Sequence, residues 1–176
     1  GNAYQTIVAS QPSRVFTNGI SSLFFDGSDD FIYAPHSTNQ WIGTNDFSIS
    51  VCFSRPASIS AHLVNKSSSG NRSFYISPRS DGTIRFVSST NKASSESLIF
   101  SSGPILTNNI MQTITVQRIN GEARMYLNGS EVSTSGTVAS NISPEGSTSP
   151  IRIGSYDTSG YFNGNIYYIF FSVGKL

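Results

Sequence analysis

Short segments in which apolar and polar residues alternate dominate this chain. The clearest covers residues 47–53, where Phe47, Ile49, Val51 and Phe53 alternate with Ser or Cys. Successive side chains of a strand point to opposite faces, so this pattern predicts a strand with one face on a core and the other more open. No long stretch carries apolar residues at helical spacing, and we therefore expect a protein built from strands.

A second pair of alternating segments predicts a hairpin. Thr113–Arg118 and Glu122–Leu127 flank the dipeptide Asn120-Gly121. Asn and Gly adopt the positive φ angles that the tight turns of hairpins require. A second Asn-Gly pair follows at 128–129 and predicts that the chain turns back once more.

The remaining strands and loops follow from the same criteria. Strands are predicted at Ser22–Phe25, Phe31–Tyr33, His62–Lys66, Ser73–Ser77, Thr83–Val87, Ser97–Phe100, Ile151–Gly154 and Asn165–Phe171. Loops rich in Ser, Thr, Asn and Gly are predicted at Ser67–Asn71, Ser88–Ser95 and Ser133–Ser149. About a dozen short strands without helices predict an all-β fold, an antiparallel β-sandwich. We expect one domain over residues 19–176 and an arm or linker over residues 1–18.

The order of several motifs resembles the laminin G-like domains of the concanavalin A-like superfamily, which occur in bacterial surface and phage tail proteins. The motifs are LFFDGSDDF at 23–31, NDFSISV at 45–51, LVNK at 63–66, DGTIRF at 81–86, RMYLNGSEV at 124–132 and IRIGS at 151–155. The chain departs from this pattern at 110–114, where such domains often carry a Trp. The resemblance implies a jelly-roll sandwich, and it does not specify a function.

Composition narrows the function classes. Charged residues make up only 12% of the 176 residues, about half the usual share, so Ser, Thr and Asn must supply most of the polar surface. Such a surface suits neutral ligands such as glycans. The net charge of +1 without a basic run argues against nucleic-acid binding. No apolar run is long enough for a membrane span, and membrane insertion is not expected. Cys52, the single cysteine, is expected to be a buried apolar residue.

The acidic residues do not favour an enzyme. Glycosidases on such sandwiches place two carboxylates on either side of one glycosidic bond. The four glutamates, Glu96, Glu122, Glu131 and Glu145, have no second acid nearby on the same strand face. His36 and His62 are far apart in sequence and lack partners of the triad type. We therefore expect a protein without catalytic residues, although distant residues can converge in space.

One group of acidic residues is a candidate metal site. Asp26, Asp29 and Asp30 supply oxygen ligands at close spacing, and many domains of the resembled family bind calcium. Hard oxygen ligands at a turn would suit Ca²⁺. The favoured alternative is that these carboxylates cap the turns by accepting hydrogen bonds from their own backbone.

Sugar binding needs an exposed aromatic ring and fixed polar groups around it. The candidates in predicted loops are Trp41, Arg72, Tyr156, Asp157, Tyr161 and Asn163. The segment 156–161 is the most suggestive, with two tyrosines and an acid in one loop. Alternatively, Tyr161 anchors the last strand and Trp41 closes an edge of the sandwich. An acidic glycan would need Arg72, Arg79 or Arg152 nearby.

These observations lead to one functional hypothesis and one rival. We expect a non-catalytic glycan-binding or adhesion module, part of a virion tail or cell-surface protein, located outside the cell or on a virion. Its partners would be a surface glycan and other subunits of the assembly. The rival is a structural module that contacts only protein, because both faces of the strand at 166–171 are apolar.

Overall fold

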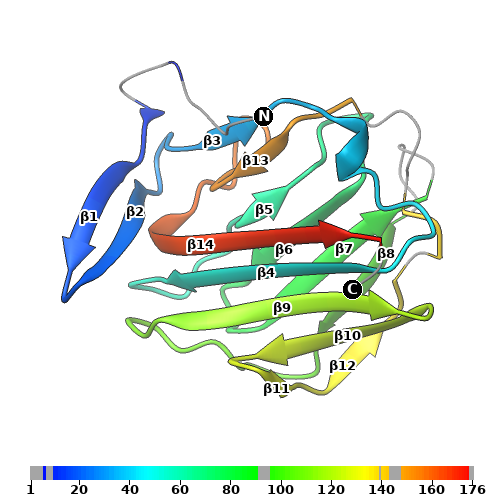
Figure 1. The fold of residues 1–176 in the computed structure, drawn as a ribbon. Coiled ribbons are helices and arrows are strands. Elements are labelled where there is room, and N and C mark those ends of the chain that lie inside the picture. The colour runs from blue at the N-terminus through cyan, green and yellow to red at the C-terminus, as the bar shows by residue number, and fades with distance from the viewer. Residues whose placement is uncertain (1–5, 7–9, 91–95, 139, 143–147, 175–176) are drawn as a thin grey trace.

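The computed structural model describes residues 6, 10–90, 96–138, 140–142 and 148–174, and these form two antiparallel sheets packed face to face (Figure 1). Sheet one has the strand order β1-β2-β14-β4-β9-β10-β11, and sheet two has the order β12-β8-β7-β6-β5-β13-β3. The strands are β1 (Ser13–Thr17), β2 (Ile20–Asp26), β3 (Ile32–Ala34), β4 (Phe47–Ser54), β5 (Val64–Asn65), β6 (Phe74–Pro78), β7 (Ile84–Ser89), β8 (Glu96–Ser101), β9 (Gln112–Ile119), β10 (Glu122–Leu127), β11 (Ser130–Glu131), β12 (Thr134–Gly136), β13 (Ile151–Ile153) and β14 (Asn163–Val173). The prediction of an all-β sandwich is confirmed.

The core lies between the sheets and is filled by their inward rows. Phe47, Ile49, Val51 and Phe53 of β4 are fully buried, which confirms the predicted register of that strand. Aromatic rings from both sheets meet there: Phe47 lies 5.5 Å from Phe86, measured between ring centroids. Burial of such rings is a main source of stability in a sandwich.

The outward face of β4 is less open than its sequence predicts. Ser48 and Cys52 are 4% exposed although they point away from the core. Neighbouring strands cover them: Gln117 of β9 donates a hydrogen bond to Ser48 Oγ at 3.2 Å, and Tyr168 of β14 stands opposite Cys52. Small side chains in a central strand are shielded by the larger side chains on either side.

Two edge strands lie in segments that the sequence assigns to an arm and a loop. β1 lies within the predicted arm at 1–18 and forms a hairpin with β2, which follows the arm. β12 pairs with β8 within the segment Ser133–Ser149, so the prediction of an uninterrupted loop there is wrong. Three residues of Ser, Thr and Gly carry no alternation, and only the neighbouring strand β8 fixes them as a strand.

Three buried cations hold the loops at the ends of the sandwich. Arg118 is 2% exposed and donates to the carbonyl oxygens of Gly43, Asn45 and Ser140. Lys66 is fully buried, and its Nζ donates to the Ser149 carbonyl oxygen at 2.8 Å and to a side-chain amide oxygen. Arg55 likewise donates to the carbonyl oxygens of residues 59 and 79. The loops are thereby tied to the sheets by side-chain hydrogen bonds, and burial lowers the pKa of each cation.

The β9–β10 hairpin gives a test of its turn. Asn120 and Gly121 have φ angles of 53° and 83°, as predicted. Gly121→Val is expected to lower the free energy of unfolding by about 1–3 kcal/mol, because a β-branched residue is strained at positive φ. A Cβ at Gly121 would meet no atom within 4 Å, so the cost would be conformational. Gly103→Ala, which also meets open space but needs no positive φ, is the control and should change stability little in urea denaturation.

Candidate functional site

A recess opens on the outer face of sheet two and is lined by three aromatic rings and two guanidinium groups. Its lining residues are His62, Arg72, Tyr75, Arg85 and Tyr156, and its volume is about 300 Å³. Tyr75, only 8% exposed, forms the floor. The other four side chains are half-buried and surround it. We refer to this site below as the recess.

The alternation of the strands places these side chains outward. In β6, Phe74 and Ile76 point into the core, so Tyr75 between them must point out. In β7, Ile84 and Phe86 are likewise buried, and Arg85 points to the same outer face as Tyr75. The recess therefore rests on two strands whose inner faces are fixed in the core.

The rings of the recess pack against one another in edge contacts. The His62 ring lies 4.9 Å from the Tyr75 ring at an interplanar angle of 67°, and 5.1 Å from the Tyr156 ring. The Arg85 guanidinium carbon lies 5.3 Å from the centroid of the Tyr75 ring, a cation–π contact. These contacts fix the side chains before any ligand arrives, which reduces the entropy lost on binding.

The electrostatics of the recess are those of a positively charged site. Burial, with a smaller contribution from the charge on Arg85, lowers the pKa of His62 to about 4, so its imidazole is neutral at physiological pH. Among the residues that the structure describes, the lining contains no carboxylate. Arg72 and Arg85 are therefore the charged groups that line it, and both are positive.

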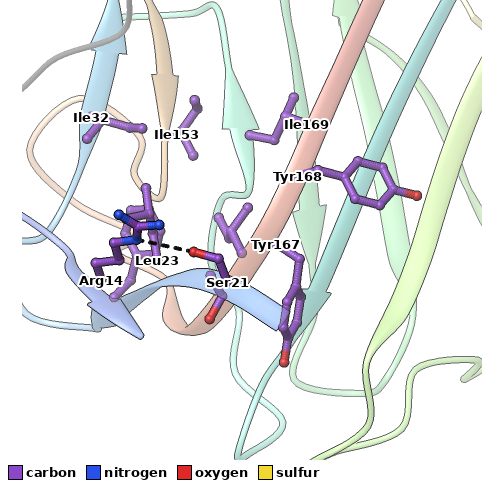
Figure 2. A pocket seen from close by; sticks show the side chains of 11 residues that line it. Arg14, Ser21, Leu23, Ile32, Ile153, Tyr167, Tyr168 and Ile169 are labelled. Carbon is purple, nitrogen blue, oxygen red and sulfur yellow. Dashed lines mark hydrogen bonds between the residues drawn. The ribbon is translucent and has the colours of Figure 1, made fainter. Parts of the chain in front are cut away.

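A second hollow lies at the side of the sandwich and has a different character (Figure 2). It has a volume of about 360 Å³ and lies between β2, β14, β3 and β13. Ile32, Ile153 and Ile169 line one side of it, while Arg14 bonds to Ser21 at the rim at 3.3 Å (Figure 2). Its walls are mostly apolar, with five aliphatic residues among the eleven that line it, which suits a hydroxyl-rich sugar less well than the recess does.

Of the six predicted ligand-binding residues, the structure brings two into the recess. Arg72 and Tyr156 line it, although they are 84 positions apart in the sequence. Asp157 follows Tyr156, but its carboxylate lies 3.7 Å from the guanidinium of Arg152 and so balances that charge. Tyr161 is half-buried at the end of the same loop and does not line the recess.

The other two predicted residues lie elsewhere. Trp41 ends a short 3-10 turn, and its ring lies 5.8 Å from that of His36, beside the buried Lys66. Asn163 begins β14 and stands opposite Asp26 in the neighbouring strand, with its side chain against Gly27. The six residues therefore do not form one site.

Sequence reasoning did not single out three of the recess residues as ligand-binding. His62 was considered only as a triad member, and Tyr75 and Arg85 lie inside predicted strands. The sequence did carry a signal for Tyr75 and Arg85, because both residues occupy the outward positions of their strands. The pairing of β6 with β7 sets Tyr75 opposite Val87 and Arg85 opposite Ser77, and only this register makes them neighbours.

The three aspartates of the predicted metal site do converge. Ligand atoms of Asp26, Asp29 and Asp30 lie within 4.8 Å of one another. Burial, together with the charges of Asp26 and Asp29, raises the pKa of Asp30. They also cap the turn as the alternative hypothesis expects: Asp30 accepts from the Asp26 backbone N–H at 2.8 Å, and Asp26 accepts from the Ser28 N–H at 2.7 Å. A hard cation such as Ca²⁺ fits these donors and would relieve the repulsion among the carboxylates.

A family model described as the concanavalin A-like lectin/glucanases superfamily matches residues 26–168. The chain belongs to this superfamily, and the resemblance seen in its motifs is confirmed. A comparison with curated proteins found no match. No helix in the described part of the chain is long and apolar enough to cross a membrane.

Solved structures of binding domains share the fold. Domains LG4-5 of the mouse laminin alpha1 chain are 17% identical, with a TM-score of 0.59 over 94% of this chain and 42% of that one. The Ruminococcus gnavus IT-sialidase CBM40 bound to alpha2,3 sialyllactose is 11% identical, with a TM-score of 0.65. The match covers 86% of this chain and 89% of that one. Botulinum neurotoxin type C, whose cell entry depends on two ganglioside molecules, is 18% identical, with a TM-score of 0.64. The match covers 94% of this chain and 42% of that one. The chain thus spans less than half of the laminin and neurotoxin structures.

The depressed pKa of His62 predicts how stability depends on pH. Because the folded-state pKa lies near 4 and the ordinary value is 6.5, the unfolded chain takes up the proton first as the pH falls. The free energy of unfolding should therefore fall between about pH 6.5 and pH 4, by up to about 3 kcal/mol from this residue. Urea denaturation at several pH values measures it.

The His62→Gln variant should lose most of this pH dependence, since glutamine does not titrate. His36→Gln is the matched control, because it removes the other histidine and should leave most of the slope in place. Equal slopes for the wild type and His62→Gln would show that the His62 ring is protonated normally in the folded protein.

Proposed function

We propose that this chain is a non-catalytic carbohydrate-binding module that recognises a surface glycan through the recess. The observation that carries the proposal is the cluster of His62, Tyr75 and Tyr156 rings beside the guanidiniums of Arg72 and Arg85. Sugar rings stack on aromatic faces, and their hydroxyls accept and donate hydrogen bonds to fixed polar groups. The recess combines both kinds of group on a rigid sheet.

Solved structures with this fold support the proposal. One of them is bound to sialyllactose, and another belongs to a neurotoxin whose cell entry depends on ganglioside molecules. The low share of charged residues, 12%, gives a surface rich in Ser, Thr and Asn that is compatible with a hydrated glycan. We place the module, as part of the same proposal, in a virion tail or cell-surface protein, outside the cell or on the virion.

The absence of catalysis belongs to this proposal as well. Glycoside hydrolysis needs two carboxyl groups about 5–10 Å apart across one bond. The recess, as far as the structure describes it, is lined by no carboxylate, and Glu122 and Glu131 are both bound to Arg124 at an exposed edge. Retention of an intact glycan after prolonged incubation is the outcome that this part of the proposal requires.

A second candidate function is that of a structural module in an assembly. The outer face of sheet one carries Tyr168 and Phe170 on β14, which are 50% and 53% exposed. Exposed aromatic residues on a flat sheet can be covered by another subunit. Sedimentation of the isolated domain tests this: a stable oligomer that disperses in Phe170→Ser, with no glycan bound, would favour the structural role.

The glycan proposal predicts that Tyr156→Ala weakens binding in a glycan array and in titration calorimetry. The loss should be about three- to tenfold, because one stacking ring contributes about 0.5–1.5 kcal/mol. The melting temperature should fall only slightly, since Tyr156 is half-buried at the rim. Tyr161→Ala in the same loop is the control and should bind as the wild type does. A wild type that binds no glycan on a broad array contradicts the proposal.

We propose further that Asp26, Asp29 and Asp30 bind Ca²⁺. The convergence of the three carboxylates supports this, because their negative charges lie close enough together for one cation to neutralise. Saturating Ca²⁺ should raise the melting temperature of the wild type and not that of Asp29→Asn, while Mg²⁺ should act weakly. Asp157→Asn is the control for loss of an acidic residue elsewhere. A wild-type melting temperature that Ca²⁺ leaves unchanged would rule the site out.

A further inference from the structure

Arg85 places its positive charge against an aromatic ring of the recess. It is half-buried at the rim of the recess, where its guanidinium lies over the Tyr75 ring. Its Nε is buried and has no hydrogen-bond partner among the described residues. No carboxylate in the described part of the chain lies within ion-pair distance of it. A positive charge that has lost part of its hydration without gaining an anion is costly in a folded protein.

Four other guanidinium groups in the described chain have hydrogen-bond or ion-pair partners within it. Arg118 and Arg55 donate to backbone carbonyls. Arg152 faces the carboxylate of Asp157, and Arg124 bonds to two glutamates on its own hairpin. At the recess, the Arg85 guanidinium is instead stacked on a tyrosine ring, and an anion from solution could serve as its partner.

The surroundings of Arg85 add to the positive potential and do not cancel it. Arg72 lines the same recess, and the third basic group there, His62, is neutral in the folded protein because its pKa is lowered. The hydroxyls of Tyr75 and Tyr156 are donors for an anion as much as acceptors.

We infer that the recess selects acidic glycans, with a carboxylate or sulfate of the sugar bound by the Arg85 guanidinium and the sugar ring against Tyr156. This inference rests on the proposed glycan-binding function and names its ligand class. A guanidinium presents two parallel N–H donors, which match the two oxygens of a carboxylate or sulfate. The stack on Tyr75 holds the donor plane in position and lowers the entropic cost of that pairing.

The test uses three probes that share a neutral body: lactose, 3′-sialyllactose and 3′-sulfolactose. Each is titrated by calorimetry against the intact chain, at low salt and at about 0.5 M salt, where exposed charges are strongly screened. The wild type should bind both acidic probes at least about tenfold more tightly than lactose, and salt should weaken only the acidic ones. Comparing the affinities for 3′-sialyllactose, which carries a carboxylate, and 3′-sulfolactose, which carries a sulfate, shows whether the recess distinguishes the shape of the acidic group or only its charge.

The variant series isolates Arg85. Arg85→Gln should reduce binding of the acidic probes about tenfold or more and leave lactose unchanged. Arg79→Gln removes the same charge from outside the recess lining and should bind as the wild type does. Arg85→Lys keeps the charge without the planar fork, so it should bind acidic probes with intermediate affinity, and it serves if Arg85→Gln unfolds.

A second measurement follows His62 itself by NMR. An anion beside Arg85 should raise the pKa of His62 above its value in the free protein, whereas lactose should not, because a negative charge favours the imidazolium. The other groups that line the recess around this ring are Tyr75, Tyr156, Arg72 and Arg85.

The outcomes separate the two proposals. Equal affinity for lactose and both acidic probes, or unchanged acidic selectivity in Arg85→Gln, overturns the inference while glycan binding stands. Binding of neutral glycans alone on a broad array also overturns the inference and leaves the proposed glycan binding in place. A wild type that binds no probe and no arrayed glycan overturns the proposed function and this inference together.

Discussion

The strict alternation of inward and outward side chains in β6 and β7 is the constraint on which the rest of this structure depends. Phe74, Ile76 and Phe86 cannot leave the core without exposing large apolar surfaces to water. Each therefore fixes its neighbours on the opposite face. Tyr75 and Arg85 point outward, side by side, because the core permits no other register.

The loop that completes the recess is held by backbone bonds and by one glycine. Tyr156 and Ser159 exchange backbone hydrogen bonds at 2.8 Å, which closes a tight turn after β13. The backbone N–H of His62 donates to the Gly160 carbonyl oxygen at 3.0 Å, and a Cβ at Gly160 would come within 2.6 Å of the His62 ring. The absence of a side chain at Gly160 thus lets the imidazole pack under Tyr156.

The two outer faces of the sandwich differ in ways that bear on function. The face of sheet two combines rings with two guanidiniums in a recess, which suits a ligand with both an apolar ring face and polar substituents. The face of sheet one has short hydroxyl side chains in its centre, such as Ser50 and Thr115 bonded at 2.8 Å, with Tyr168 and Phe170 exposed beside them. A flat surface of that kind suits contact with another macromolecule.

The sequence by itself determined most of the strands, the hairpin at Asn120-Gly121 and the superfamily, because alternation and turn residues act locally and most strands carry their own signal. It also indicated the aspartate cluster, whose members lie within five positions of one another. The edge strand β12 has no such signal, since a neighbour creates it. The recess depends on the pairing of β5, β6 and β7 and on a loop that follows about 70 residues later. The sequence therefore singled out Arg72 and Tyr156 as candidates but could not show that they line the same site. Only the tertiary structure decided that Arg85 lies beside them, since the partners of a charge depend on contacts between strands and not on their order.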